Sequence, residues 1–301
     1  MTSVTNQTSS LSLTSHSLYK RCHLDYRISI IGLFIGFLVG LTGMGGGALL
    51  APIMILVLRV PPVWAIGTDN AYSAVTKAVG AFVHIQQKTF SLRYLKIALW
   101  LACGSVPATI FGVWVVQYIR NFYGPAINDL IIHSIGFTLL LVAILLVIKP
   151  FIMRRLDHKN VERQKLAALH GETMPAEGTT KWENRYRPLV TIAVGAIVGF
   201  LVGLTSVGSG TLIIVALAFL FPRLSSKELV GADISHAVML HVAATLAYFN
   251  AGTIDWTIVL LLLIGSLPGV FLGSKLSKYI PDRIMRPILA TVLVISGWKM
   301  I

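Results

Sequence analysis

The sequence predicts an all-α polytopic membrane protein that consists of two homologous repeats and has about 8–10 membrane segments. Two observations on composition and one on repetition lead to this fold class. Hydrophobic residues make up 55% of the 301 residues and charged residues only 12%, whereas soluble domains contain about 25% charged residues. The charges are also segregated, and none occurs in the stretches 28–58, 97–119, 130–148, 188–222 and 256–274. Several of these stretches exceed the ~20 residues with which a helix crosses a bilayer.

The repetition is a seven-residue run, Gly-Phe-Leu-Val-Gly-Leu-Thr, which occurs at 36–42 and again at 199–205. Each copy leads into a break of small residues, at 43–47 and at 206–210. Two further pairs of segments match in the same order: Gly67-Thr68-Asp69 with Gly231-Ala232-Asp233, and Gly104-Ser105-Val106-Pro107 with Gly265-Ser266-Leu267-Pro268. A glycine-rich break in corresponding hydrophobic segments of two halves is typical of a transporter's binding site.

Taken in order, the chain divides into a polar N-terminal tail over 1–27, a first membrane repeat over 28–149, a hydrophilic cytoplasmic linker over 150–187 and a second membrane repeat over 188–301. The apolar run after Lys20 and Arg21 continues to residue 58 without a convincing cleavage site, so we expect a retained membrane segment and not a signal peptide. A short surface helix is expected near 153–169. The formal charge of +13 follows from Lys and Arg in cytoplasmic loops, so no nucleic-acid partner is expected.

The relative orientation of the repeats depends on how each glycine-rich break is built. If a break lies within one long crossing helix, each repeat has four spans and both repeats point the same way. If each break forms a hairpin or two half-helices that enter and leave on one side, the repeats are inverted. The inverted arrangement places somewhat more Lys and Arg on the cytoplasmic side, although it leaves Lys20, Arg21 and Arg27 outside, and we favour it.

The breaks are the expected binding site. Irregular backbone in a membrane persists only inside protein or beside a water-filled cavity, because unsatisfied N–H and C=O groups are costly in hydrocarbon. Where a helix restarts after a break, its free N–H groups and positive dipole end attract anions. The alternative is that the glycines serve only tight helix packing. The residues expected to bind substrate at the breaks are Thr42, Gly43, Met44, Gly45, Gly46, Thr205, Ser206, Gly208 and Ser209.

Ionisable residues within membrane segments are functional candidates by default. Lys77 and His241 correspond at an offset of 164 residues, and we expect both to bind the substrate. The two aspartates of the set also correspond, and the alternative for each of them is a helix N-cap. Histidines are included because they titrate near neutral pH. The residues expected to act in coupling or as structural polar groups are Asp69, Asp233, His84 and His236.

Catalytic and metal-binding motifs are absent from the sequence, so we expect no enzyme activity, no catalytic residues, no metal and no cofactor. The glycine-rich run from Thr42 to Gly47 lacks the Gly-Lys-Ser/Thr of a nucleotide-binding loop. There is no His-Glu-x-x-His sequence, and the two cysteines, Cys22 and Cys103, lie in different contexts without metal-ligand or disulfide spacing.

Three motifs carry a resemblance to a known family: the break Gly40–Ala48 followed by Pro52, the segment Ala65–Thr68 and the segment Gly265–Gly269. With these motifs the sequence resembles the sulfite exporter TauE/SafE family, also called the toluene sulfonate uptake permease family, over nearly all of its length. The second break departs from the family's more glycine-rich form. The resemblance implies a bacterial inner-membrane protein that moves sulfite, sulfonates or related organosulfur or carboxylate anions.

We therefore expect a secondary transporter, an exporter or permease, whose small anionic substrate binds between the two breaks near the bilayer midplane. Protons are the candidate coupling ion, the lipid bilayer is the other partner, and a homo-oligomer is compatible with the sequence. Alternating access is expected from one half rocking against the other. The rival hypothesis is a non-transporting membrane scaffold or assembly protein, in which the glycines pack helices and the buried polar residues are internal ties.

Overall fold

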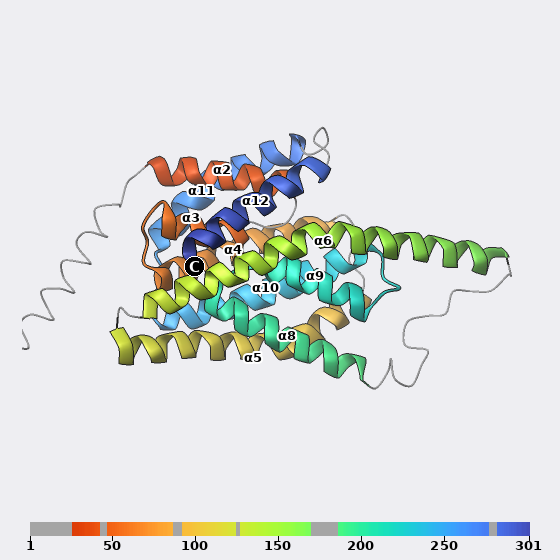
Figure 1. Ribbon diagram of the computed structural model, residues 1–301, viewed down its shortest axis with the longest axis horizontal. Coiled ribbons are helices and arrows are strands. Elements are labelled where there is room, and N and C mark those ends of the chain that lie inside the picture. The colour runs from red at the N-terminus through yellow and green to blue at the C-terminus, as the bar shows by residue number, and fades with distance from the viewer. Residues whose placement is uncertain (1–25, 43–46, 87–91, 125–126, 170–185, 277–281) are drawn as a thin grey trace, which may run out of the picture.

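The computed structural model describes residues 26–42, 47–86, 92–124, 127–169, 186–276 and 282–301 (Figure 1). Within these residues there are helices and no strand, which confirms the all-α class. The helices are α2 (Tyr26–Thr42), α3 (Gly47–Leu56), α4 (Pro62–Gln86), α5 (Leu92–Tyr123), α6 (Ile127–Leu169), α8 (Arg187–Thr205), α9 (Ser209–Leu220), α10 (Ser226–Asn250), α11 (Trp256–Leu276) and α12 (Asp282–Met300).

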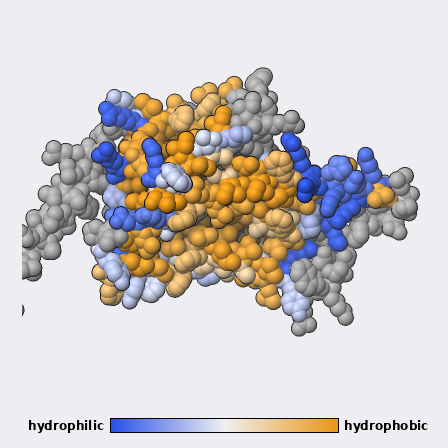
Figure 2. Space-filling view, viewed as in Figure 1, coloured by the Kyte–Doolittle hydropathy of each residue, from blue (hydrophilic) through white to orange (hydrophobic). Residues whose placement is uncertain are grey.

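In the part of the chain that the structure describes, five helices, α5, α6, α8, α10 and α11, are long and apolar enough to cross a membrane. Figure 2 shows a broad apolar belt around the middle of the molecule, with hydrophilic side chains gathered at its two ends. A bilayer imposes this distribution, because charged side chains are costly in hydrocarbon. The chain is a multi-pass membrane protein.

Helix α6 is longer than the sequence analysis anticipated. It continues through Pro150 to Leu169, so the surface helix expected near 153–169 is the end of a membrane helix and not a separate element. In Figure 1 this part of α6 projects beyond the rest of the bundle. The start of this part packs against the bundle, since Met153 and Leu156 contact the apolar cluster that includes Phe221 and Leu224.

In two helix pairs, glycines allow the two backbones to approach each other closely. A Cβ atom on Gly36 of α2 would lie 2.3 Å from the carbonyl oxygen of Ser266 in α11, and one on Gly199 of α8 would lie 2.3 Å from that of Ser105 in α5. Only glycine permits such an approach of two backbones. Further along α2, Gly40 faces Val270, so the residue numbers of α2 and α11 rise together and the two helices are parallel.

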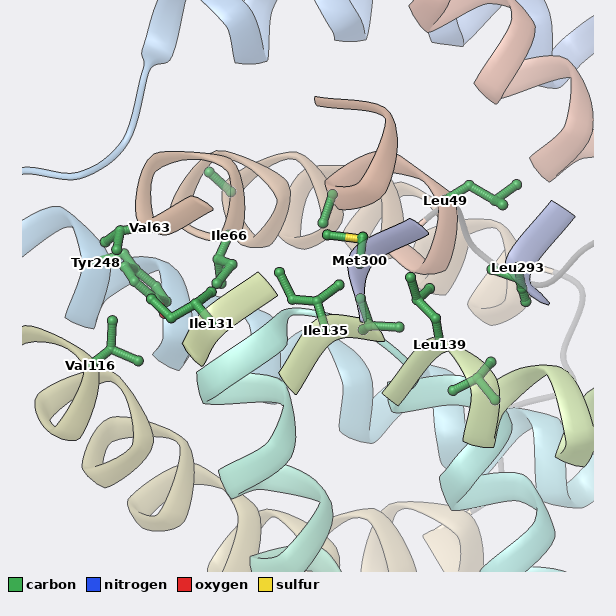
Figure 3. Packing of buried hydrophobic residues seen from close by; sticks show 14 of the residues in the cluster. Leu49, Val63, Ile66, Val116, Ile131, Ile135, Leu139, Tyr248, Leu293 and Met300 are labelled. Carbon is green, nitrogen blue, oxygen red and sulfur yellow. The ribbon is translucent and has the colours of Figure 1, made fainter. Parts of the chain in front are cut away.

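The apolar core consists of three clusters. One joins α2, α3 and α4 to α11. A second joins α8, α9 and α10 to α5, with residues 152–156 of α6 packed against it. The third and largest lies between them, and its centre is α6, whose residues Ile131, Ile135 and Leu139 point into the packing shown in Figure 3. Each of the first two clusters thus combines three consecutive helices with one helix from elsewhere in the chain.

The direction of the helices along the bundle can be followed in Figure 1. Helix α2 runs from left to right in this view, and α8 runs from right to left before the chain turns back into α9. The part of α6 beyond the bundle and the beginning of α8 lie at the same end. The helices α4 and α10 pack against each other in the interior. The buried polar side chains that they carry are Thr68, Asp69, Asn70, Ser73, Asp233, His236 and His241.

Candidate functional site

A group of polar side chains lies inside the bundle where α4, α5, α9 and α10 approach one another. Burying polar groups in a membrane protein is costly unless they are partnered, so such a group is a candidate site. The half-buried Lys77 of α4 belongs to it. Its buried members are Asp69, Asn70, Ser73, Ser105, Ser206, Ser209, Asp233, His236 and His241.

Lys77, Ser209 and His241 are in mutual contact. The ammonium of Lys77 donates to Ser209 Oγ at 2.6 Å, and its Nζ lies 3.0 Å from His241 Nε2. Ser209 Oγ and His241 Nε2 are 3.1 Å apart. Three residues that the sequence analysis named as substrate-binding therefore meet at one point, although they come from three different helices.

The break between α8 and α9 lies beside this contact. Helix α8 ends at Thr205, and the backbone then turns through Ser206 at φ 59° and Gly208 at φ 90° before α9 begins at Ser209. The φ of Gly208 is one that glycine adopts readily and other residues do not. A Cβ atom there would meet Val142 of α6 at 2.7 Å, so this glycine also faces a packed neighbour.

The first turn of α9 has backbone N–H groups without an intrahelical partner. The first intrahelical bond runs from Leu212 N to Gly208 O at 3.1 Å, and no side chain caps the helix. The N–H groups of Ser209, Gly210 and Thr211 therefore lack the partner that a helix interior provides. These donors and the ammonium of Lys77 lie at the same helix end, which is an arrangement suited to an anion.

The N-cap alternative for Asp69 and Asp233 is wrong. Asp69 lies well inside α4, which begins at Pro62. Asp233 lies inside α10, whose N-cap is Ser225 in a capping box with Glu228. Both carboxyl groups are buried, and each has an oxygen, Asp69 Oδ2 and Asp233 Oδ1, without a hydrogen-bond partner among the described residues. Both act electrostatically on Lys77.

His236 occupies a separate position on α10. Its Nε2 lies 2.7 Å from Ser105 Oγ of α5, and its Nδ1 is buried without a hydrogen-bond partner in the described part of the chain. The sequence analysis had used Ser105 only to align the two halves. It also missed Asn70, whose Oδ1 lies 3.0 Å from His241 Nδ1. The signal was present in both cases, since each is a polar residue within an apolar helix and next to a matched position.

Several residues named from the sequence are not brought to this point. Gly43, Met44, Gly45 and Gly46 lie outside the described residues, as do the side chains of Thr42 and His84. The hydroxyl of Thr205 donates to Leu201 O at 2.8 Å and accepts from Val207 N at 3.3 Å, so it supports the end of α8. No cluster of three or more His, Cys, Asp or Glu residues suited to a metal ion occurs in the described ranges.

The sequence is similar to membrane transporters from bacteria and archaea. Over 278 residues it is 37% identical to "Probable membrane transporter protein YjnA" of Bacillus subtilis, a match that covers 92% of this chain and 100% of the relative. "Probable membrane transporter protein YdhB" of the same organism is 24% identical over 90% of this chain and 97% of its own length. "Probable membrane transporter protein MJ0441" of Methanocaldococcus jannaschii is 24% identical over 90% and 93%.

No solved structure matches the chain. The family described as "Sulfite exporter TauE/SafE" matches residues 28–300, which is nearly the whole chain and includes every described helix except the first two residues of α2. The homologues are transporters by name and not enzymes. The chain belongs to the sulfite exporter TauE/SafE family of membrane transporters.

Proposed function

We propose that this transporter moves a small anion, such as sulfite, a sulfonate or a related organic anion, and that the anion binds at the N-terminus of α9 beside Lys77. The observation that carries the proposal is the 2.6 Å contact between Lys77 Nζ and Ser209 Oγ, which holds a cationic group at the first residue of the helix. The helix end and the ammonium attract the same sign of charge. Charge-assisted hydrogen bonds of this kind are also stronger than neutral ones.

The site is proposed to lie between the two glycine-rich breaks. The second break, at 206–210, supplies the α9 donors. The first break, at 43–47, is assigned the matching role because it follows the same seven-residue run. Both would then face the interior near the middle of the bilayer, as broken helices of transporters do.

We further propose that the two halves are inverted repeats. Two observations support this arrangement. In Figure 1 α2 and α8, which begin the two halves, run in opposite directions. Lys77 and His241, which correspond at the offset of 164, contact each other as equivalent residues on a two-fold axis would. With the linker inside the cell, the chain would lie in the bacterial inner membrane with its basic loops in the cytoplasm.

The proposed moving units differ from the two halves of the sequence. Because α2 is in backbone contact with α11, and α8 with α5, a rocking of residues 28–149 against 188–301 would break both glycine-lined contacts. A motion that keeps each of the first two apolar clusters intact avoids this cost. The units would be α2, α3, α4 and α11 on one side and α8, α9, α10 and α5 on the other. Lys77 and His241 would lie at the boundary between them.

A binding and transport experiment tests the proposed function. Purified protein is screened by thermal unfolding with sulfite, methanesulfonate and acetate, and then reconstituted in liposomes for uptake of radiolabelled sulfite. We expect saturable stabilisation by at least one of the three anions and uptake that this anion inhibits. If none of them stabilises the protein or is transported, the anion site is wrong and the scaffold hypothesis is the better one.

A further inference from the structure

His241 has a partner at each ring nitrogen, and these partners determine where its proton lies. His241 Nδ1 is 3.0 Å from Asn70 Oδ1. The orientation of the Asn70 amide is set from its other side, because Asn70 Nδ2 donates to Ile66 O at 2.9 Å and an amide oxygen there would face a carbonyl oxygen. Asn70 Oδ1 is therefore an acceptor, and His241 Nδ1 must carry the hydrogen.

The other nitrogen is then the one that can gain a proton. In the neutral ring with hydrogen on Nδ1, Nε2 has a free lone pair. This lone pair faces two donors, the ammonium of Lys77 at 3.0 Å and the hydroxyl of Ser209 at 3.1 Å. A proton on Nε2 would instead point an N–H at the ammonium. Two cations would then lie 3.0 Å apart around a fully buried ring, which is strongly unfavourable.

An anion removes this conflict. Bound at the N-terminus of α9, it would lie beside Ser209, the residue that both Lys77 and His241 contact. The oxygen atoms of the anion can then accept hydrogen bonds from the Lys77 ammonium and from the protonated imidazole of His241 at the same time. Lys77 turns toward the anion, so its ammonium no longer faces His241 Nε2. The negative charge of the anion then compensates both cations.

The remaining charged groups near His241 leave this assignment in place. Lys77 of α4 and His236 of α10 act electrostatically on His241 itself. Asp69 and Asp233 act on Lys77, and Lys149 of α6 acts on Asp233. His236 is the other buried histidine of the site, but its Nε2 is bonded to Ser105 and it makes no contact with Ser209 among the described interactions.

We propose that His241 Nε2 takes up one proton when the anion binds, so that the protein carries one proton with each anion. This rests on the proposed function. The proton comes from water on the side from which the anion enters, forms an N–H bond with the Nε2 lone pair, and returns to water when the anion leaves. No other bond is made or broken, and Asn70 keeps the hydrogen of Nδ1 in place throughout.

The test uses methanesulfonate, which stays ionised across the working pH range, so that any pH dependence of binding comes from the protein. Calorimetry on the purified full chain is carried out in Tris and in imidazole buffers between pH 6.5 and 8.5. We expect the wild-type affinity to fall about tenfold for each unit of rising pH once the histidine is neutral in the unbound protein, with one proton taken up per anion. His241→Gln should bind with little pH dependence, and His236→Gln, the matched control, should keep the wild-type slope.

A second readout does not depend on a variant that folds. In protein labelled with 15N at histidine, the ring nitrogens of His241 should show the neutral Nδ1–H form without methanesulfonate and two protonated nitrogens with it. Binding with the same affinity at every pH, or a bound state with neutral His241, overturns proton uptake and leaves the anion site intact. Absence of binding at every pH, for methanesulfonate as for sulfite and acetate, overturns the proposed function and this inference with it.

Discussion

Lys77 Nζ lies 3.0 Å from His241 Nε2, although the two residues are 164 positions apart in the chain. The same offset relates Gly67–Asp69 to Gly231–Asp233. In a two-fold arrangement a residue meets its own equivalent only on the axis. Under the proposed repeat this contact marks the axis, and a change in either side chain therefore affects both halves of the polar site.

Removing the charge of Lys77 tests its role in binding. Lys77→Met keeps a long side chain but loses the ammonium, so the affinity for the anion should fall about 10- to 100-fold, as expected for a hydrogen bond to a charged group. Ser209 and His241 remain in contact with each other, so we expect the variant to fold. Lys77→Arg retains the positive charge, so its affinity for the anion should fall less than that of Lys77→Met. If Lys77→Met unfolds or fails to accumulate while Lys77→Arg is normal, Lys77 is a structural tie.

The hydroxyls of the second break should differ in their effect on binding. Ser209→Ala removes the group that contacts both Lys77 and His241, and the affinity should fall about fivefold, which corresponds to ~1 kcal/mol. Thr205→Val is the matched control, because that hydroxyl bonds to the backbone of Leu201 and Val207. It should lower thermal stability and leave the affinity unchanged. Equal loss of affinity in both variants would contradict the placement of the anion at Ser209.

The glycines of the repeated run are predicted to act in packing. Gly36→Ala and Gly199→Ala each place a methyl group 2.3 Å from a backbone oxygen of the neighbouring helix, so each should cost about 1–3 kcal/mol of stability. Gly80→Ala in α4 is the control: apart from its chain neighbours and the adjacent backbone of its own helix, no atom lies within 4 Å of the added Cβ, and alanine should stabilise the helix by up to ~1 kcal/mol. Thermal unfolding in detergent ranks the three variants by stability. A stable Gly36→Ala or Gly199→Ala would exclude the tight contacts of α2 with α11 or of α8 with α5.

Gly208 should be sensitive for a different reason. Gly208→Ala combines a φ of 90° with a contact of 2.7 Å to Val142, and we expect a loss of about 1–3 kcal/mol in thermal or denaturant unfolding. Adding Val142→Ala should relieve the steric part of this cost but not the backbone strain. The effect of Val142→Ala alone is measured separately and subtracted. Full recovery in the double variant would mean that the backbone conformation at Gly208 carries no cost.

Topology can be measured by labelling single cysteines. In a background without Cys22 and Cys103, a cysteine at Lys165 in the projecting part of α6 and one at Asn250, the last residue of α10, should react from opposite sides of the membrane. Both positions are exposed. Reaction of both from the same side would contradict the proposed inverted arrangement.

The sequence predicted the membrane class and the position of the second break, and it singled out Lys77 and His241 as corresponding residues, because each depends on local composition or on the repeat. It did not predict that these two side chains contact each other. It did not predict the starts of α4 and α10 correctly enough to place Asp69 and Asp233 in helix interiors. For α10 the signal was available, since Ser225 and Glu228 have capping-box spacing. The contacts of α2 with α11 could not be foreseen, because nothing local specifies which distant helix lies against a glycine-lined face.

The pairing of α2 with α11 also constrains how the protein is made. Helix α2 ends at Thr42, whereas α11 begins at Trp256. At about 5–20 residues per second, roughly 10–40 s of synthesis separate the two. During this interval Gly32, Gly36 and Gly40 are without the helix that finally covers them, whereas α8 is synthesised after its partner α5. Helix α2 must therefore stay in the bilayer for this interval without α11 against its glycines. A ribosome that stalls before α11 leaves a product in which α2 has no native neighbour along that face.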